Sequence, residues 1–265
     1  MEKGKAEKAE KELEGEVGKR ERVLALGTPN EKQKQFFLAG ERYVAYGGAR
    51  GGGKSWAVRV KALLLCLNYR GCRVLILRRT LPELCWNHVR PLQSLTKGLA
   101  VYSETKSAFT FQNGSVILCG FCAHEGDTAR YQGQEFDFIF IDEATQFTER
   151  AFNFLCGCLR GTTAIPRRMY LTCNPGGVGH RWVKRLFIDR QFKTDCDNPE
   201  ENEDPNDYEF IPALVEDNVL EPRIHLIRPL GVDPVALALL QLVLGTREVR
   251  LGETAFDFSR VDAVQ

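Results

Sequence analysis

The strongest constraint on the fold of this chain is a glycine-rich segment that ends in Lys-Ser. Its residues are Gly48, Ala49, Arg50, Gly51, Gly52, Gly53, Lys54 and Ser55, which fit the phosphate-loop pattern G-x-x-x-x-G-K-[ST]. Glycines let backbone N–H groups turn inward around a phosphate, and a helix that begins there adds partial positive charge. An apolar run precedes the loop and a helical pattern follows it, so the alternative of a plain connecting turn is disfavoured. We expect Lys54 to neutralise the β- and γ-phosphates of a nucleotide, and the Ser55 hydroxyl to bind Mg²⁺.

Length and composition place the chain among folded globular proteins. It has 265 residues, of which 43% are hydrophobic and 27% charged, enough for one or two packed domains. The 36 basic and 35 acidic residues give a net charge of +1, which excludes neither nucleic acid nor an acidic partner. No apolar stretch is long enough for a membrane span or a secretory signal. We therefore expect a protein that is not secreted and has no membrane partner.

Short apolar runs alternate with helical patterns, which is typical of a parallel α/β sheet with helices on both faces. The runs expected to be strands are 43–46, 73–78, 116–120, 137–141 and 169–172. A helix is expected over 55–68, where apolar residues recur at helical spacing. Asn113-Gly114 lies between two β-type runs and predicts an added β-hairpin, because both residues tolerate positive φ.

Two adjacent carboxylates, Asp142 and Glu143, end the apolar run that begins at Phe136. A buried strand that ends in two acids is costly unless a cation or a polarised water awaits them. We expect Asp142 to hold Mg²⁺ through water, and Glu143 to orient and deprotonate a water that attacks the γ-phosphate. The alternative is a pair of acids that caps a following helix around 144–152.

Another run ends in small polar residues, Thr172, Cys173 and Asn174, before a sharp Pro-Gly-Gly turn. Such residues at the carboxyl edge of a parallel sheet face the ligand crevice. Thr172 and Asn174 could hydrogen-bond the attacking water or the γ-phosphate and register its loss; the alternative is a turn without a role. Gln33, ahead of the first strand, could read the adenine edge, although a single amide is a weak signal.

The roles of several basic residues stay open. Arg50, inside the loop, would either point into solvent or swing onto the γ-phosphate as an arginine finger from the same chain. Arg130 and Arg160 are further candidates for the finger and could act on a neighbouring subunit. Arg181, Lys184 and Arg185 share one face of an expected helix. That face suits contact with a DNA backbone, and it is equally typical of an ordinary solvated surface.

In order and approximate spacing, these segments resemble the ATPase domain of phage terminase large subunits, the motors that drive viral DNA into a procapsid. The resemblance covers about 29–218. It rests on Tyr46 to Ser55, on Tyr131 to Glu135 ahead of Ile141 to Ala144, on Thr172 to Gly177 ahead of His180 to Lys184, and on Phe210 to Ala213 with Asp217-Asn218.

The resemblance implies a RecA-like P-loop NTPase core of the class that carries a catalytic Glu, with ATP and Mg²⁺ as cofactors. The positions that match the family are Gln33 for adenine, Arg50 as the finger proposed to act in cis, Lys54 and Ser55 in the phosphate loop, Asp142 and Glu143 as metal and catalytic carboxylates, and Thr172, Cys173 and Asn174 as the motif that couples hydrolysis to DNA movement.

The family also implies partners and a location. These are double-stranded viral DNA, a portal protein, a small terminase subunit and further copies of this chain in a ring, in the cytoplasm of the bacterial host. The predicted function is Mg²⁺-dependent ATP hydrolysis that powers DNA translocation into a procapsid. One alternative is a non-catalytic or truncated terminase remnant that binds nucleotide. A helicase-like ATPase is less favoured, because it would need a second RecA-like domain.

The resemblance divides the chain into three segments. We expect 1–28 to be a charged, flexible N-terminal segment, 29–218 to be the P-loop ATPase domain, and 219–265 to be an atypical C-terminal tail. Family members carry a C-terminal nuclease domain of RNase H type that the last segment does not resemble, so we expect no nuclease activity from this chain. A frameshift, a truncation or a split gene would each account for this difference.

Overall fold

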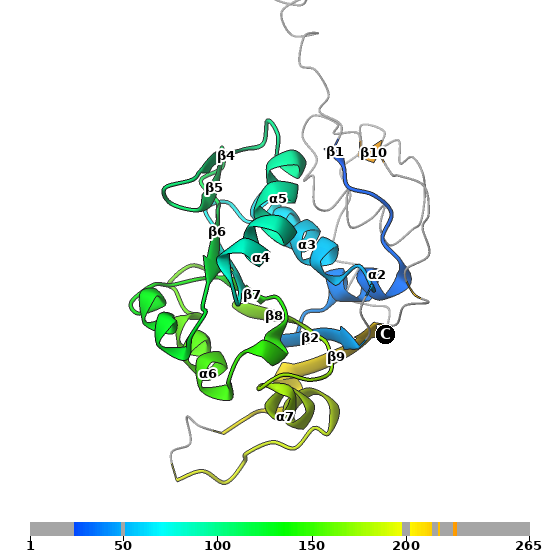
Figure 1. The fold of residues 1–265 in the computed structure, drawn as a ribbon, viewed down its shortest axis with the longest axis vertical. Helices are drawn as coiled ribbons and strands as arrows, with labels where there is room; N and C mark the ends of the chain where they lie inside the picture. Colours follow the sequence, from blue (N-terminus) through cyan, green and yellow to red (C-terminus); the bar gives the residue numbers. More distant parts are fainter. Residues whose placement is uncertain (1–23, 49–50, 198–201, 214–216, 218–224, 227–265) are drawn as a thin grey trace, which may run out of the picture.

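An eight-stranded sheet forms the centre of the protein, in a computed structural model that describes residues 24–48, 51–197, 202–213, 217 and 225–226 (Figure 1). The strand order is β4-β5-β6-β3-β7-β8-β2-β9. Six adjacent strands, β6, β3, β7, β8, β2 and β9, are parallel to one another. At one edge, β5 pairs antiparallel with β6, and β4 pairs antiparallel with β5. The strands are β2 (Tyr43–Gly48), β3 (Arg73–Arg78), β4 (Ala100–Ser103), β5 (Ala108–Phe111), β6 (Val116–Phe121), β7 (Phe138–Ile141), β8 (Arg168–Cys173) and β9 (Tyr208–Ala213).

Helices cover both faces of this sheet (Figure 1). One face carries α2 (Glu31–Leu38), α3 (Lys54–Asn68), α4 (Leu81–Leu84), η1 (Cys85–Val89) and α5 (Arg90–Leu95). The other carries η2 (Glu125–Tyr131), η3 (Ala144–Gln146), α6 (Glu149–Cys158), α7 (His180–Val183) and η4 (Lys184–Ile188). A short turn, η6 (Pro205–Asp207), leads into β9. The predicted α/β fold with helices on both faces is confirmed. Among the helices of the described ranges, none combines the length and the apolar character of a membrane span.

Alternate strand residues belong to two separate hydrophobic cores. In β3, for example, Val74 and Ile76 face the core beneath α3, whereas Leu75 and Leu77 face the core beneath α6. All four side chains are fully buried. Because successive side chains of a strand point to opposite faces, a strand covered on both faces must be apolar throughout. This requirement explains the continuous apolar runs in the sequence.

The predicted hairpin is confirmed by the antiparallel pairing of β5 with β6. Gly114 has φ +85°, a left-handed conformation that favours glycine. The Asn113 amide nitrogen donates to the Cys66 carbonyl oxygen at 2.7 Å, which ties the turn to α3. The hairpin continues into β4, a strand that the sequence did not predict.

Packing extends beyond the predicted start of the central domain. Leu26, in the segment predicted to be a charged extension, is 6% exposed and belongs to the core beneath α3. Its carbonyl oxygen accepts a hydrogen bond from the indole of Trp56 at 3.1 Å. Two short strands, β1 (Leu24–Ala25) and β10 (His225–Leu226), pair with each other and join positions from the predicted N-terminal and C-terminal segments.

A buried lysine joins α2 to α3. Lys61 is 3% exposed, and its ammonium group donates hydrogen bonds to the carbonyl oxygens of Phe36, Phe37 and Ala39 at the end of α2. The same group lies 4.0 Å from the ring centroid of Tyr170. The last carbonyls of a helix lack partners within the helix, so this side chain satisfies acceptors that would otherwise be buried alone.

Replacing Lys61 with Met should lower the free energy of unfolding by about 2–4 kcal/mol, because three buried carbonyls lose their donor while the aliphatic volume is kept. Denaturant unfolding measures the change. The exposed Lys97 is the matched control, and Lys97→Met should shift stability by less than about 0.5 kcal/mol. Equal losses in the two variants would contradict this role of Lys61.

Candidate active site

The glycine-rich loop begins at the end of β2, at the carboxyl edge of the sheet. Gly48 has φ +142°, and a Cβ atom there would lie 2.5 Å from the Ala213 carbonyl oxygen of the neighbouring β9. Glycine is therefore required at this position. The Tyr46 hydroxyl donates to the Gly52 carbonyl at 3.2 Å and ties the loop to its strand.

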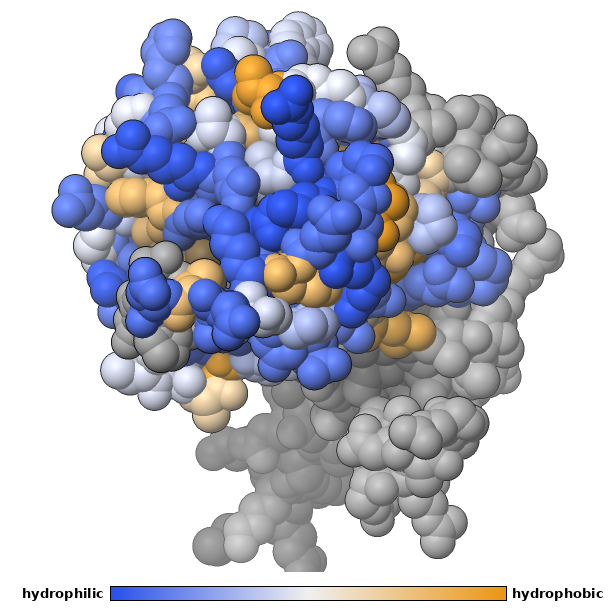
Figure 2. All heavy atoms as spheres, turned by 90° about the horizontal axis from the view of Figure 1, so that it is seen from below, coloured by the Kyte–Doolittle hydropathy of each residue, from blue (hydrophilic) through white to orange (hydrophobic). Residues whose placement is uncertain are grey.

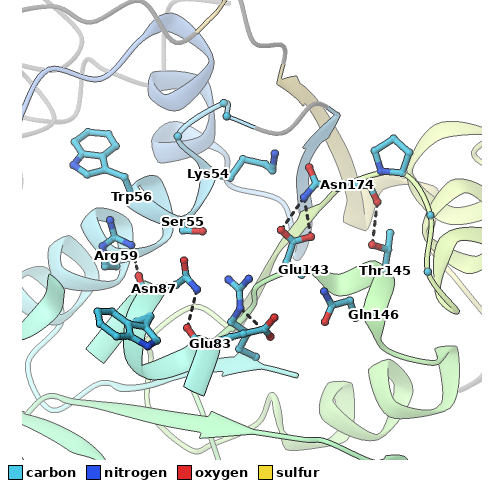
Figure 3. Close-up of a pocket in the computed structure, with 18 of the residues that line it drawn as sticks. Lys54, Ser55, Trp56, Arg59, Glu83, Asn87, Glu143, Thr145, Gln146 and Asn174 are labelled. Atoms are coloured by element: carbon cyan, nitrogen blue, oxygen red, sulfur yellow. Dashed lines mark hydrogen bonds and ion pairs between the residues drawn. The ribbon is translucent and has the colours of Figure 1, made fainter. Parts of the chain in front are cut away.

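A cavity of about 850 Å³ opens beside this loop (Figure 3). Its volume lies in the range of small-molecule sites. Ala49 and Arg50 lie outside the described residues, so the phosphate contact and the arginine finger predicted there stay predictions. The predicted residues that the cavity brings together are Gly51, Gly52, Gly53, Lys54, Ser55, Glu143 and Asn174.

Lys54 is the first residue of α3 and extends toward Glu143 and Asn174 (Figure 3). Only 7% of its surface is exposed. Burial lowers the pKa of Lys54, while the charges of Glu143 and Asp142 act in the opposite direction. A buried cation beside two carboxylates is well placed to bind an anionic ligand, such as a phosphate group.

Asp142 follows β7 and is 1% exposed. Its carboxylate accepts hydrogen bonds from the Thr172 hydroxyl at 2.5 Å and from Ser55 at 3.2 Å. It also contacts the His88 ring at 2.8 Å and the guanidinium group of Arg78. Burial alone would raise the pKa of Asp142, but His88, Arg78 and Thr172 together hold it below its ordinary value. Asp142 is therefore an anion whose charge is compensated from several elements.

Glu143 has an unusual backbone for a residue with a side chain. Its φ of +61° and ψ of +53° lie in the left-handed region, which costs about 1–2 kcal/mol for a non-glycine residue. The Glu143 N–H donates to the Thr172 hydroxyl at 3.0 Å. The Asn174 amide donates to both carboxylate oxygens, at 2.7 and 2.8 Å (Figure 3). These contacts hold the carboxylate in the cavity.

The strand order explains why Thr172 and Asn174 meet the two acids. β8 lies between β2 and β7, and register pairs Thr172 with Tyr46 of β2. All three strands are parallel, so their carboxyl ends meet at one edge. Cys173, predicted with them, is buried, and burial raises the pKa of its thiol to about 12. It is therefore a buried, protonated thiol, and its predicted part in coupling stays a prediction.

Ser55 and Asp142 together suit a magnesium ion. A hydroxyl and a carboxylate are hard oxygen ligands, the type that Mg²⁺ prefers. Mg²⁺ usually takes few protein oxygens and completes its octahedral shell with waters and substrate phosphates. Ser55 lines the cavity that contains Lys54, and the Asp142 carboxylate lies 3.2 Å from the Ser55 hydroxyl. They therefore fit Mg²⁺ that is bound together with nucleotide phosphates.

Two partners of Asp142 were missed in the sequence, Arg78 and His88. Arg78 ends β3 at the same sheet edge as Asp142, so the rule that parallel strand ends converge could have identified it. His88 lies within the helical segment that follows β3 and is fully buried. No local signal distinguishes it from an ordinary core histidine.

Gln33 is 4% exposed and lies at the start of α2, close to the loop. Its amide oxygen accepts the Asn30 N–H at 2.9 Å, and its amide nitrogen lies 3.5 Å from the Gly53 carbonyl. The side chain thus caps α2 and reaches the phosphate loop. Its predicted contact with adenine stays a prediction.

The predicted DNA-contacting residues differ in their surroundings. Arg185 pairs with Glu149 at 2.8 Å and with Glu203 at 2.7 Å. Lys184 pairs with Asp189 at 2.6 Å. Arg181 is exposed, and among the described residues its side chain has no hydrogen bond or ion pair. The shared basic face is therefore largely neutralised by acids of the same chain, and DNA contact there stays a prediction.

Comparisons with known proteins place these features in a family. A family model described as phage terminase large subunit matches residues 41–220. No curated protein sequence matches the chain. The matched range contains Lys54, Asp142, Glu143 and Asn174 and leaves Gln33 outside.

Solved structures of large terminases share the fold. A large terminase from a thermophilic bacteriophage matches with a TM-score of 0.57 at 16% identity, over 73% of this chain and 47% of that one. A complex of the same large terminase with ATP-gamma-S gives 0.54 at 16% identity, over 73% and 46%. The ATPase domain of the Thermus phage P74-26 large terminase gives 0.50 at 16% identity, over 70% and 81%. The chain spans about half the length of the first of these proteins.

Replacing Thr172 with Val should free the Glu143 amide, because the only hydroxyl that accepts its N–H is removed while the volume is kept. We expect a loss of about 1–3 kcal/mol in unfolding free energy and faster hydrogen exchange at that amide. Thr172→Ser keeps the hydroxyl and should exchange at close to the original rate. An unchanged rate of hydrogen exchange at the Glu143 amide in Thr172→Val would show that its hydrogen bond to the Thr172 hydroxyl does not protect it.

Proposed function

Because the chain belongs to the family of phage terminase large subunits, we propose that its cavity hydrolyses ATP in a Mg²⁺-dependent reaction that powers the packaging of viral DNA. The observation that carries this proposal is the position of Glu143. Its carboxylate is held by Asn174 in the same cavity as Lys54. A carboxylate placed opposite a phosphate-binding cation suits activation of a water molecule for attack.

The chain supplies binding and proton transfer. The loop N–H groups and Lys54 would bind the phosphates, with the N-terminal dipole of α3 adding to the attraction. Ser55 and Asp142 would hold Mg²⁺, which neutralises charge on the phosphate oxygens when it is bound. Glu143 would orient the attacking water and accept its proton. Arg50 is the proposed arginine finger within the same chain.

Asn174 is the proposed link between hydrolysis and DNA movement. It donates to Glu143 and its carbonyl oxygen accepts the Thr145 hydroxyl at 3.0 Å, so it joins the catalytic carboxylate to η3. Loss of the γ-phosphate would alter the hydrogen bonds of the Glu143 carboxylate. The change would reach η3 and α7, which lie against each other on the same face of the sheet.

The partners proposed for this motor follow from its family. They are double-stranded viral DNA, a portal protein, a small terminase subunit and further copies of the chain in a ring. The proposed location is the cytoplasm of the bacterial host. Among the proposed DNA contacts, Lys184 and Arg185 pair with acids of the described residues, whereas the side chain of Arg181 is exposed and has no such pair.

Glu143→Gln should reduce ATP hydrolysis by about 100-fold or more while ATP binding is retained, since the amide cannot accept a proton. Lys54→Ala should instead weaken ATP binding by about tenfold or more. Phosphate release and the fluorescence of a labelled nucleotide measure the two properties. Glu104→Gln, in the exposed turn between β4 and β5, is the control. A protein that binds ATP but hydrolyses none, with or without Glu143, would favour the alternative of a non-catalytic remnant.

Gln33→Ala should reduce the preference for ATP over GTP by about tenfold if the amide reads adenine. Gln33→Glu keeps the oxygen that accepts the Asn30 N–H, so it preserves the cap of α2 while removing the amide donor. Binding constants for both nucleotides measure the preference. If both variants retain the ATP preference, Gln33 serves the fold and not the base.

A further inference from the structure

Both oxygens of the Asp142 carboxylate are engaged by side chains of the same chain. Oδ1 accepts the Thr172 hydroxyl at 2.5 Å. Oδ2 contacts Ser55 at 3.2 Å, His88 at 2.8 Å and the guanidinium group of Arg78. The side chain is 1% exposed, so no solvent competes for these places. The predicted magnesium ligand is thus already paired with a cation of its own chain.

Arg78 is the charged partner of Asp142 that lines the cavity. It ends β3, lines the cavity together with Ser55, and its side chain is 10% exposed. Its Nε lies 3.6 Å from Oε2 of Glu83, the first acidic residue of the next helix. Neither of these two atoms has a hydrogen bond within the described residues. The Glu83 carboxylate is therefore a second possible acceptor for the guanidinium group of Arg78.

Glu83 is well placed to receive the guanidinium group. Its side chain is 44% exposed and reaches into the cavity near Asn87 (Figure 3). The Asn87 amide donates to the Glu83 carbonyl at 2.8 Å, which holds this turn of helix against the cavity. A small rotation of Arg78 would exchange a buried carboxylate for a half-exposed one.

A divalent cation held at Asp142, directly or through a water, would lie close to the guanidinium group of Arg78. Both are positively charged, and their repulsion is poorly screened in a buried site. Binding of the metal would therefore favour a position of Arg78 away from Oδ2.

We propose that Arg78 is the counter-ion of Asp142 in the metal-free site and turns to Glu83 when Mg²⁺ binds, so that the Arg78–Glu83 pair sets the affinity of the site for the metal. This inference rests on the proposed function, because it takes Asp142 as the metal-binding carboxylate. His88 stays in place as the buried support of the carboxylate. Arg78 thereby compensates the charge of Asp142 before the nucleotide arrives.

The test measures metal binding directly, without turnover. Mn²⁺ is titrated into the nucleotide-free and ADP-bound protein and followed by electron paramagnetic resonance, with Mg²⁺ as competitor. Arg78→Gln should bind Mn²⁺ about tenfold more tightly, because the competing cation is removed. Glu83→Gln should bind it about three- to tenfold more weakly, because the displaced arginine loses its second partner. Arg79→Gln is the control, since Arg79 donates to the Gln146 carbonyl and does not contact Asp142.

The double variant separates this exchange from simple electrostatics. If Glu83 acts through Arg78, Glu83→Gln should have no further effect in the Arg78→Gln protein. An equal weakening in both backgrounds would overturn the proposal, as would unchanged metal affinity in Arg78→Gln. Glu83 is half exposed, so Glu83→Gln should fold, and an unchanged metal affinity in this variant would overturn the proposal even if Arg78→Gln fails to fold. Metal affinities that follow this pattern in a protein without ATP hydrolysis would overturn the proposed function and leave the exchange standing.

Discussion

The compensation of one buried charge organises this molecule. Asp142 lies at the centre of the sheet edge with almost no exposure, a position that is strongly unfavourable for an isolated anion. Its donors come from four separate elements: Ser55 from α3, Arg78 from β3, His88 from η1 and Thr172 from β8. Each of these elements must therefore dock correctly before the charge is compensated. The same requirement brings the phosphate loop, the two acids and the polar end of β8 into one cavity.

The parallel sheet makes this convergence possible. Strands β2, β8, β7 and β3 are neighbours and run in the same direction, so their carboxyl ends meet at one edge. The insertion of β8 between β2 and β7 puts Asn174 within reach of Glu143, which adopts a left-handed backbone at the turn after its strand. Strain of this kind persists only where surrounding contacts hold it, and here the Thr172 hydroxyl accepts the amide hydrogen of the strained residue.

Much of the fold and part of the site could be predicted from local patterns. The strands, the helix after the loop and the hairpin at Asn113-Gly114 each carry a short-range signal, namely an apolar run, a helical spacing or a turn-forming pair. β4 and β9 carry weaker ones, and both lie at the outer edges of the sheet, where one neighbour suffices. The basic residues Arg181, Lys184 and Arg185 show what a local pattern cannot predict. Their spacing places them on one helix face. The structure then shows that Lys184 pairs with Asp189 and that Arg185 pairs with Glu149 and Glu203, which the spacing does not predict.

The class of the fold, the candidate phosphate loop and the two carboxylates at the end of β7 could be read from the order of residues alone. These follow from backbone chemistry and hydrophobic periodicity, which act between residues close together in the chain. The groups that share the charge of Asp142, and the side chain that holds Glu143, became known from the folded arrangement. Those contacts join positions far apart in the sequence, such as Arg78 with Asp142 and Asn174 with Glu143. The interaction energy of a buried anion with its partners depends on their separation and on the local dielectric. A local pattern of residues predicts neither of these quantities.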